Sequence, residues 1–443
     1  MAAGTAYSPL TDLLIAVPTV ILVCKAGAQM IRRFGQPPVV GELAVGIVLG
    51  PSLLGWLWPQ AQEWLFPRAV LPYLDALGTL GLLAFMFLVG LQLDLRSLRG
   101  HSKAAVAVSQ ASIALPLALG FLLALGMYRS FAPEGVGRVQ FALFLAVSIS
   151  VTAFPVLARI LTDRGLYRTR VGALAMTCAA VDDVTAWCLL AVVVAVTKSS
   201  SPFDAVTTAL LTFAFALFMY FAVRPLLARW AARAERAYTE SVVLVVLFSG
   251  VCLSSLATEE IGVHALFGAF LFGVATPRGN RTIERQAARI EAFTVPVLLP
   301  LFFVTTGLKT DISLLAGDPL QWLWAVAVLA VAVLAKWGGG AGAARLAGES
   351  WRDALSIGAL MNCRGLTELV VLNIGLSLGV IGPALFTVLV LMALVTTTMT
   401  SPVLSLLRRR SQEDPAEHPA RAVDSFPVDQ SARPEDQTTV TVG

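Results

Sequence analysis

Two adjacent carboxylates stand in the middle of an apolar stretch. Asp182 and Asp183 lie in LAMTCAAVDDVTAWCLLAVVVAV, within residues 169–197. If that stretch spans a membrane, each charge costs at least about 2.5–3.5 kcal/mol, and such residues usually mark ion paths or proton relays. Two close carboxylates titrate in separate steps, so one of them keeps its proton more readily than the other. The pair therefore predicts a site that binds either a proton or a small cation.

A lysine stands in a second apolar stretch, VAVLAKWGGGAGAARLAG. Because a buried lysine either finds a carboxylate or loses its proton, we expect Lys336 to pair with one of the two aspartates. The four glycines within residues 338–342 predict a thin helix that a neighbour approaches closely. The alternative is that both aspartates only join helices, by pairing with Lys336 and Arg364. An apolar replacement would join them without the desolvation cost, which favours a functional role.

The stretch 139–162 contains a proline at Pro155, within SVTAFPVL. Proline lacks an N–H and clashes with the preceding turn, which predicts a broken helix. Hydroxyls at Ser148, Ser150 and Thr152 are expected to satisfy the freed backbone groups. Thr152 is also predicted to offer an oxygen ligand to a cation.

A second break is predicted in the stretch 353–378, where the polar residues Asn362, Arg364 and Glu368 interrupt MNCRGLTELVVLNIGL. Each broken helix leaves unpaired N–H and C=O ends with opposing partial charges. Arg364 and Glu368 are expected to compensate these charges and to connect the break to residues 169–197. Their role is predicted to be mainly structural.

The composition excludes most classes of soluble protein. Of 443 residues, 57% are hydrophobic and only 14% are charged, and the mean hydropathy is +0.78. Soluble domains need roughly 25% charged residues to cover their surface. A soluble enzyme, a disordered hub and a nucleic-acid binder are therefore excluded, and the chain is predicted to be a polytopic membrane protein. All five cysteines lie in apolar runs and are interpreted as buried thiols.

The apolar stretches predict an all-α fold of thirteen transmembrane helices. These are 10–33, 38–55, 70–92, 102–127, 139–162, 169–197, 203–228, 239–257, 261–276, 292–309, 319–346, 353–378 and 382–407. With the N-terminus outside and the C-terminus inside, the outer loops hold only Arg68, Arg129, Arg138, Lys198 and Lys309, while basic residues fill the inner loops. Positive residues accumulate on the cytoplasmic side, so this orientation is predicted.

The two predicted breaks fall in the fifth and twelfth spans, which cross the membrane in opposite directions. This spacing predicts inverted-topology repeats, spans 1–6 and 8–13, with span seven as their connection. Transporters built in this way bind their substrate at mid-membrane, where two discontinuous helices cross.

Several motifs resemble the monovalent cation:proton antiporter-2 family, in particular its bacterial and plant cation/proton exchanger branch. They are GQPPVVGELAVGIVLGPSLLG (35–55), SISVTAFPVLARILTDRGL (148–166), the Asp182–Asp183 stretch, IGVHALFGAFLFGVATP (261–277), LPLFFVTTGLKTDI (299–312), Lys336 and MNCRGLTELVVLNIGL (361–376). The resemblance implies that Asp183 is the carrier carboxylate and that Asp182 and Lys336 form a switchable ion pair. It also implies a homodimer in the sodium/proton antiporter fold.

The resemblance divides the chain into a scaffold and a moving core. Scaffold or dimer helices are expected in 1–99 and 231–312, core helices in 100–200 and 313–407, a connecting helix in 201–230, and a disordered cytoplasmic tail in 408–443. The expected function is exchange of Na⁺ or K⁺ for H⁺ in a bacterial inner or plasma membrane, with the lipid bilayer as surroundings. No cofactor, no bond chemistry and no nucleic-acid partner are expected.

Two other functions remain open from the sequence. Arg364 and Lys336 would contact a carboxylate in a proton-coupled transporter of organic anions, although Asp182 and Asp183 at the same depth would repel it. A cation channel also uses broken helices and carboxylates, but no repeated filter-like segment is found. A receptor or scaffold role would leave the buried charges unexplained.

Overall fold

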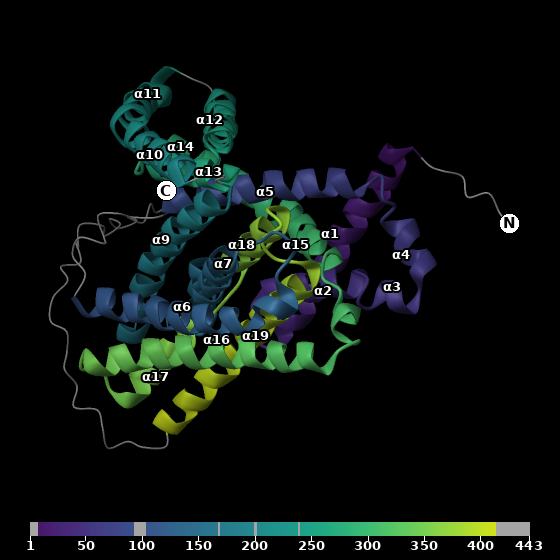
Figure 1. Cartoon of the computed structure of the whole chain (residues 1–443). Coiled ribbons are helices and arrows are strands. Elements are labelled where there is room, and N and C mark those ends of the chain that lie inside the picture. The colour runs from purple at the N-terminus through teal and green to yellow at the C-terminus, as the bar shows by residue number, and fades with distance from the viewer. Residues whose placement is uncertain (1–7, 93–102, 167–168, 199–201, 238–239, 413–443) are drawn as a thin grey trace, which may run out of the picture.

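The computed structural model describes residues 8–92, 103–166, 169–198, 202–237 and 240–412. These residues form a bundle of helices (Figure 1). The α-helices of the first half are α1 (Pro9–Arg33), α2 (Pro38–Leu49), α3 (Leu54–Leu57), α4 (Pro59–Leu65), α5 (Leu71–Gln92), α6 (Lys103–Phe131), α7 (Arg138–Ser150), α8 (Phe154–Asp163) and α9 (Arg170–Lys198).

The second half of the chain is also helical. Its elements are α10 (Pro202–Phe218), the π-helix η2 (Met219–Val223), α11 (Arg224–Ala237), α12 (Glu240–Ile261), α13 (Ala265–Ala275), α14 (Arg281–Phe293), the π-helix η3 (Thr294–Leu298), α15 (Leu299–Leu308), the 3₁₀ helix η4 (Ile312–Leu315), α16 (Pro319–Leu346), α17 (Trp351–Met361), α18 (Leu366–Ser377) and α19 (Pro383–Gln412). The disordered tail was predicted to begin at residue 408, but α19 continues to Gln412; the rest of the predicted tail, from residue 413 onward, lies outside the described residues.

The all-α membrane fold is confirmed, but the count of thirteen spans is not. Among the described residues, 11 helices are long and apolar enough to cross a membrane, and the bent pair α17 and α18 raises this to 12. The predicted span 261–276 coincides with α13, which has only 11 residues. It is short because Gly262 takes the left-handed φ of 99° after α12, and because His264 then caps α13 through Leu266 N–H.

Both predicted helix breaks are confirmed. α7 ends at Ser150 and α8 begins at Phe154, with Pro155 in the first turn of α8, where no helical N–H is needed. α17 and α18 are separated by residues 362–365, and their axes bend by 41°. A Cβ at Gly365 would lie 2.5 Å from a methyl group of Val156 in α8, so a larger residue there would have to displace that side chain where the two breaks meet.

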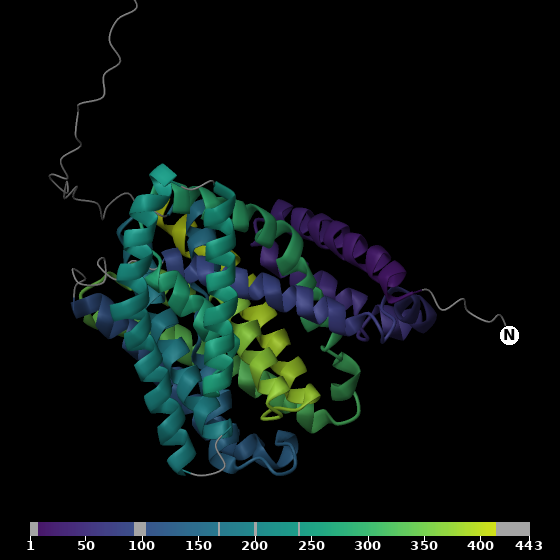
Figure 2. The same cartoon turned by 90° about the horizontal axis from the view of Figure 1, so that it is seen from above.

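The helices pack in two groups. One group contains α1, α2, α5, α12, α13 and α15, and the other contains α6 to α9 and α16 to α19. α6 lies along α16 at one side of Figure 1, while α10, α11 and α12 gather at the opposite side. Figure 2 shows α1 and the helices α10 to α12 at opposite ends of the molecule, with α19 between them.

The glycines of α16 have a narrower role than predicted. A Cβ at Gly339 would lie 2.8 Å from the Ala111 carbonyl oxygen of α6, and one at Gly340 would lie 3.3 Å from Gly358 of α17. Gly338 and Gly342 face open space. Only two of the four therefore permit the close approach of neighbouring helices.

Two further expectations are wrong. Cys188 is exposed on the surface of the bundle and Cys252 is half-buried, so only Cys24, Cys178 and Cys363 are buried thiols. The residues between spans nine and ten were expected to be an inner loop, but they form the helix α14, which Asn280 caps by accepting from Thr282 and Ile283 N–H. Arg281, Arg285 and Arg289 are spaced by one helical turn in α14. The basic residues that led us to expect a loop therefore belong to a helix.

Candidate ion-binding site

The two broken helices meet at their breaks. The backbone N–H of Ala153, between α7 and α8, donates to the Cys363 carbonyl between α17 and α18, with an N–O distance of 3.0 Å. The hydroxyl of Thr152 lies 3.2 Å from the Met361 carbonyl oxygen. Unwound backbone from two distant parts of the chain therefore lies side by side inside the bundle, beside α9 and its two aspartates.

Two cationic side chains satisfy the open end of α7. Lys336 donates to the Ser150 carbonyl, and Arg364 donates to the carbonyls of Ser148 and Ile149. The last carbonyls of a helix carry partial negative charge and lack helical donors, so cations stabilise them. The expectation that serine hydroxyls also fill this role is confirmed in part. Ser150 donates to the Val147 carbonyl in the last turn of α7, whereas Ser148 donates to the Phe144 carbonyl one turn earlier.

Asp182 is fully engaged by its neighbours. Its carboxylate accepts from Ser109 and Ser112 of α6 and from Thr152, the latter two at 2.9 and 2.8 Å. Lys336 Nζ lies 3.3 Å from Asp182 Oδ2, and both side chains are completely buried. This carboxylate is held in place by four donors, which compensate its desolvation.

Asp183 is the opposite case, although it is the next residue of α9. It is 4% exposed, and neither of its oxygens has a hydrogen-bond partner among the residues that the structure describes. The backbone N–H of Phe154 interacts with it without the geometry of a hydrogen bond. A carboxylate buried without donors binds a proton or a cation strongly, because either one removes an uncompensated charge.

Asp183 faces a small cavity. The cavity measures about 10 Å³, close to the ~10–15 Å³ that one water molecule needs. Its lining comes from the first break, from α9 and from α18: Val151, Asp183, Ala186, Trp187, Leu190, Thr367 and Val371. Most of this wall is apolar, so the carboxylate has little access to bulk water in this conformation.

Arg364 and Glu368 form a second buried pair. Arg364 Nη1 lies 3.1 Å from Glu368 Oε1, and both side chains are completely buried. Because Arg364 also bonds α7, it connects the second break to the first break rather than to α9, where we expected the connection. Asn362 caps the C-terminal end of α17 with its backbone N–H, and its side-chain oxygen has no partner among the described residues.

The residues predicted from the sequence thus lie together around the two breaks, but the sequence analysis missed two residues of this site. Ser109 and Ser112 supply half of the donors to Asp182. Their spacing of three places both hydroxyls on one face of α6, which is the signal that the sequence contains. Thr152 was predicted to be a cation ligand, which stays a prediction; in the structure its hydroxyl donates to Asp182. No cluster of three or more His, Cys, Asp or Glu residues that would hold a resident metal occurs in the described part of the chain.

Comparison with known proteins decides the family. The family model described as "Sodium/hydrogen exchanger, transmembrane" matches residues 19–407. The chain belongs to the sodium/hydrogen exchanger family. Within the wider group of monovalent cation:proton antiporters, the resemblance drawn from the motifs is confirmed, and this member is a multi-pass protein of the cell membrane.

Curated relatives of this exchanger family member differ in length. The chain is 41% identical over 401 residues to "Na(+)/H(+) antiporter NhaS4" of Synechocystis sp., covering 89% of this chain and 97% of that protein. It is 34% identical to "K(+)/H(+) antiporter 1" of Saccharomyces cerevisiae, covering 96% of this chain and 50% of the other. "Cation/H(+) antiporter 19" of Arabidopsis thaliana is 36% identical, with 90% and 50% covered. The chain therefore spans about half the length of its yeast and plant relatives.

A solved structure shares the fold of this family member. The sodium proton antiporter MjNhaP1 of Methanocaldococcus jannaschii superposes with a TM-score of 0.60, at 15% identity, over 92% of this chain and 98% of that one. At this identity the likeness establishes the architecture only.

Proposed function

We propose that this chain exchanges one monovalent cation, Na⁺ or K⁺, for protons across the membrane, and that both ligands compete for the carboxylate of Asp183. The observation that carries the proposal is the contrast between two neighbouring aspartates. Asp182 accepts from four donors, whereas Asp183 has no hydrogen-bond partner within the described part of the chain and lines a cavity. A carboxylate that no protein group neutralises is the one that a transported ion neutralises.

Competition at one group couples the two fluxes. A proton on Asp183 removes the negative charge that a cation needs, so the site holds one ligand or the other. Either ligand neutralises the buried carboxylate, which lowers the cost of moving it through an apolar interior. The empty, charged form is the costly one to move, and this difference prevents leakage.

The relatives support both candidate cations. Sodium is named for the Synechocystis relative and potassium for the yeast relative. The site offers no feature that separates the two ions beyond the size of its cavity and the number of its oxygen ligands. We therefore propose the class of monovalent cations and leave Na⁺ or K⁺ to measurement.

Alternating access completes the proposal. We infer that α6 to α9 and α16 to α19 form the core, and that α1, α2, α5, α12, α13 and α15 form a scaffold, because helices pack more extensively within each group. The crossed breaks of α7/α8 and α17/α18 support inverted repeats. Thirteen spans with an outer N-terminus and an inner C-terminus, and a homodimer joined through the scaffold, belong to the same proposal.

The geometry argues against the two other functions. Lys336 and Arg364 are occupied by backbone carbonyls and by Asp182 and Glu368, so neither is free to bind an organic anion. A channel needs a continuous polar path, whereas the cavity at Asp183 is small and mostly apolar. The proposed function is therefore exchange.

Everted membrane vesicles test this function. A proton gradient is established, and Na⁺, K⁺, Li⁺ or Rb⁺ is then added while a pH-sensitive dye reports the lumen. The proposal predicts that at least one monovalent cation causes proton efflux, and that organic anions do not. Cation flux without any proton movement would indicate a channel and contradict the proposal.

A further inference from the structure

We propose that the hydroxyl of Thr367 and the backbone carbonyl of Val151 complete the cation site with the carboxylate of Asp183. This inference rests on the proposed exchange function and names further ligands for its cation. Thr367 lies in the first turn of α18, Val151 in the break after α7, and Asp183 in α9. All three line the same cavity, so the site would form only where the two breaks meet.

Thr367 has a buried hydroxyl with nothing to bond. It is 1% exposed, and its Oγ1 has no hydrogen-bond partner among the described residues. A threonine in a helix usually donates to the carbonyl three or four residues earlier. Here both carbonyls already accept other donors: Cys363 accepts from Ala153 N–H, and Arg364 accepts from the Thr397 hydroxyl. Burying an unpaired hydroxyl is costly, and a cation bound to its oxygen would offset that cost.

Val151 contributes an oxygen for a different reason. Its carbonyl would normally accept from the N–H four residues later, and that residue is Pro155, which has no N–H. Lys336 and Arg364 satisfy the carbonyls of residues 148–150 but do not reach the one of Val151. The proline thus leaves the carbonyl of a residue that lines the cavity without a helical donor.

The chemistry of the three groups suits a cation. Hard cations take carboxylate, hydroxyl and carbonyl oxygens as ligands, and backbone carbonyls replace the hydration shell of K⁺ in channel filters. A proton needs only Asp183. The two added oxygens would therefore raise the affinity for the cation and leave the affinity for the proton almost unchanged.

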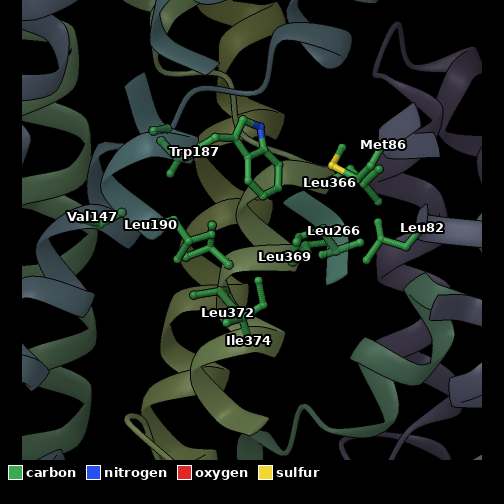
Figure 3. Packing of buried hydrophobic residues seen from close by; sticks show 14 of the residues in the cluster. Leu82, Met86, Val147, Trp187, Leu190, Leu266, Leu366, Leu369, Leu372 and Ile374 are labelled. Atoms are coloured by element: carbon green, nitrogen blue, oxygen red, sulfur yellow. The ribbon is translucent and has the colours of Figure 1, made fainter. Parts of the chain in front are cut away.

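The remaining wall is apolar. Trp187, one turn after Asp183, packs edge-to-face on Phe267 of α13 with ring centroids 5.5 Å apart, and stacks near Phe270 at 6.3 Å. Figure 3 shows Trp187 and Leu190 turned toward Leu369 and Leu372 of α18, with Leu266 of α13 beside them. The apolar wall strengthens each ion–oxygen contact, because the local dielectric constant is low.

The test compares three variants in proteoliposomes. Thr367→Val removes the hydroxyl at nearly constant volume, Thr367→Ser keeps it, and Thr396→Val is the matched control. Thr396 is also completely buried, but it bonds carbonyls of its own helix α19. Because the Thr367 hydroxyl has no hydrogen-bond partner among the residues that the structure describes, Thr367→Val should not lower the melting temperature.

The inference predicts a KM effect. Thr367→Val should raise the apparent KM for the cation at least fivefold, with the maximal rate at saturating cation within twofold of the parent. Thr367→Ser should return KM to within twofold, and Thr396→Val should not change it. An unchanged KM in Thr367→Val would overturn this role. So would a loss of both stability and maximal rate in Thr367→Val that Thr367→Ser shows as well. If Asp183→Asn still exchanges, it is the proposed function that fails, not only this inference.

Discussion

Lys336 and Arg364 both donate to the last turn of α7, although Lys336 lies in α16 and Arg364 in the break between α17 and α18. Lys336 of α16 bonds the Ser150 carbonyl, and Arg364 bonds those of Ser148 and Ile149. Two buried cations thus stabilise the end of one broken helix, while Asp182 and Glu368 balance their charge. The first broken helix therefore depends on charged residues far away in the sequence.

Removal of Arg364 should destabilise the protein strongly. In Arg364→Leu the buried Glu368 loses its partner and two carbonyls lose their donor, and breaking a buried pair costs about 3–5 kcal/mol. We expect a clear fall in melting temperature in detergent. Arg159→Leu breaks an exposed pair with Asp163 and should cost less than about 1 kcal/mol. Equal melting temperatures for the two variants would contradict the structural role of Arg364.

Asp182→Asn should keep exchange but change its charge movement. Asp182 is engaged by Ser109, Ser112, Thr152 and Lys336 and is not the proposed carrier, so Asp183 still binds cation or proton. Lys336 loses its anionic partner, which alters the charge that moves with the core. Exchange measured at clamped membrane potentials should therefore persist with a different voltage dependence. A variant that folds but is silent for every cation would contradict the assignment.

The cation should compete with protons. At lower pH, protons occupy a larger fraction of Asp183, so the apparent KM for the cation should rise, by up to about tenfold per pH unit. The maximal rate at saturating cation should stay constant, because enough cation displaces the proton. Initial rates measured over a matrix of pH and cation concentration provide the check. A maximal rate that falls at low pH while KM stays constant would indicate separate sites.

The glycines of α16 offer a matched pair. A methyl group at Gly339 would meet the Ala111 carbonyl oxygen at 2.8 Å, so Gly339→Ala must push α16 and α6 apart. Gly338 faces open space, and Gly338→Ala should be neutral or stabilise the helix by about 0.5–1 kcal/mol. Melting temperatures of the two variants measure the difference. If both behave alike, the close packing of α6 on α16 is wrong.

The sequence predicted the charged part of the site because charge is rare in apolar helices. Asp182, Asp183, Lys336, Arg364 and Glu368 all stand out for that reason, and Pro155 marks the first break. Hydroxyl residues do not stand out, since they bury cheaply by bonding their own helix. Neither the bond from Thr152 to Asp182 nor the lack of a partner for Thr367 among the described residues could therefore be predicted from the sequence.

Helix ends were harder to predict than helix interiors. The apolar run 261–276 has the hydropathy of a span, but the positive φ of Gly262 and the cap at His264 shorten the helix to α13. Which cation meets which carbonyl depends on how α16 and α17 fold back on α7. That arrangement comes from packing between distant segments, which periodicity along one chain does not encode.

The most direct test of the central claim is exchange by Asp183→Asn in proteoliposomes, beside the parent and Asp163→Asn. Asp163 lies at the exposed end of α8, where the same substitution removes a charge without touching the cavity. The account predicts no cation-dependent proton movement for Asp183→Asn with any monovalent cation at any pH, and parental exchange for Asp163→Asn. Parental rates from a folded Asp183→Asn protein would contradict it.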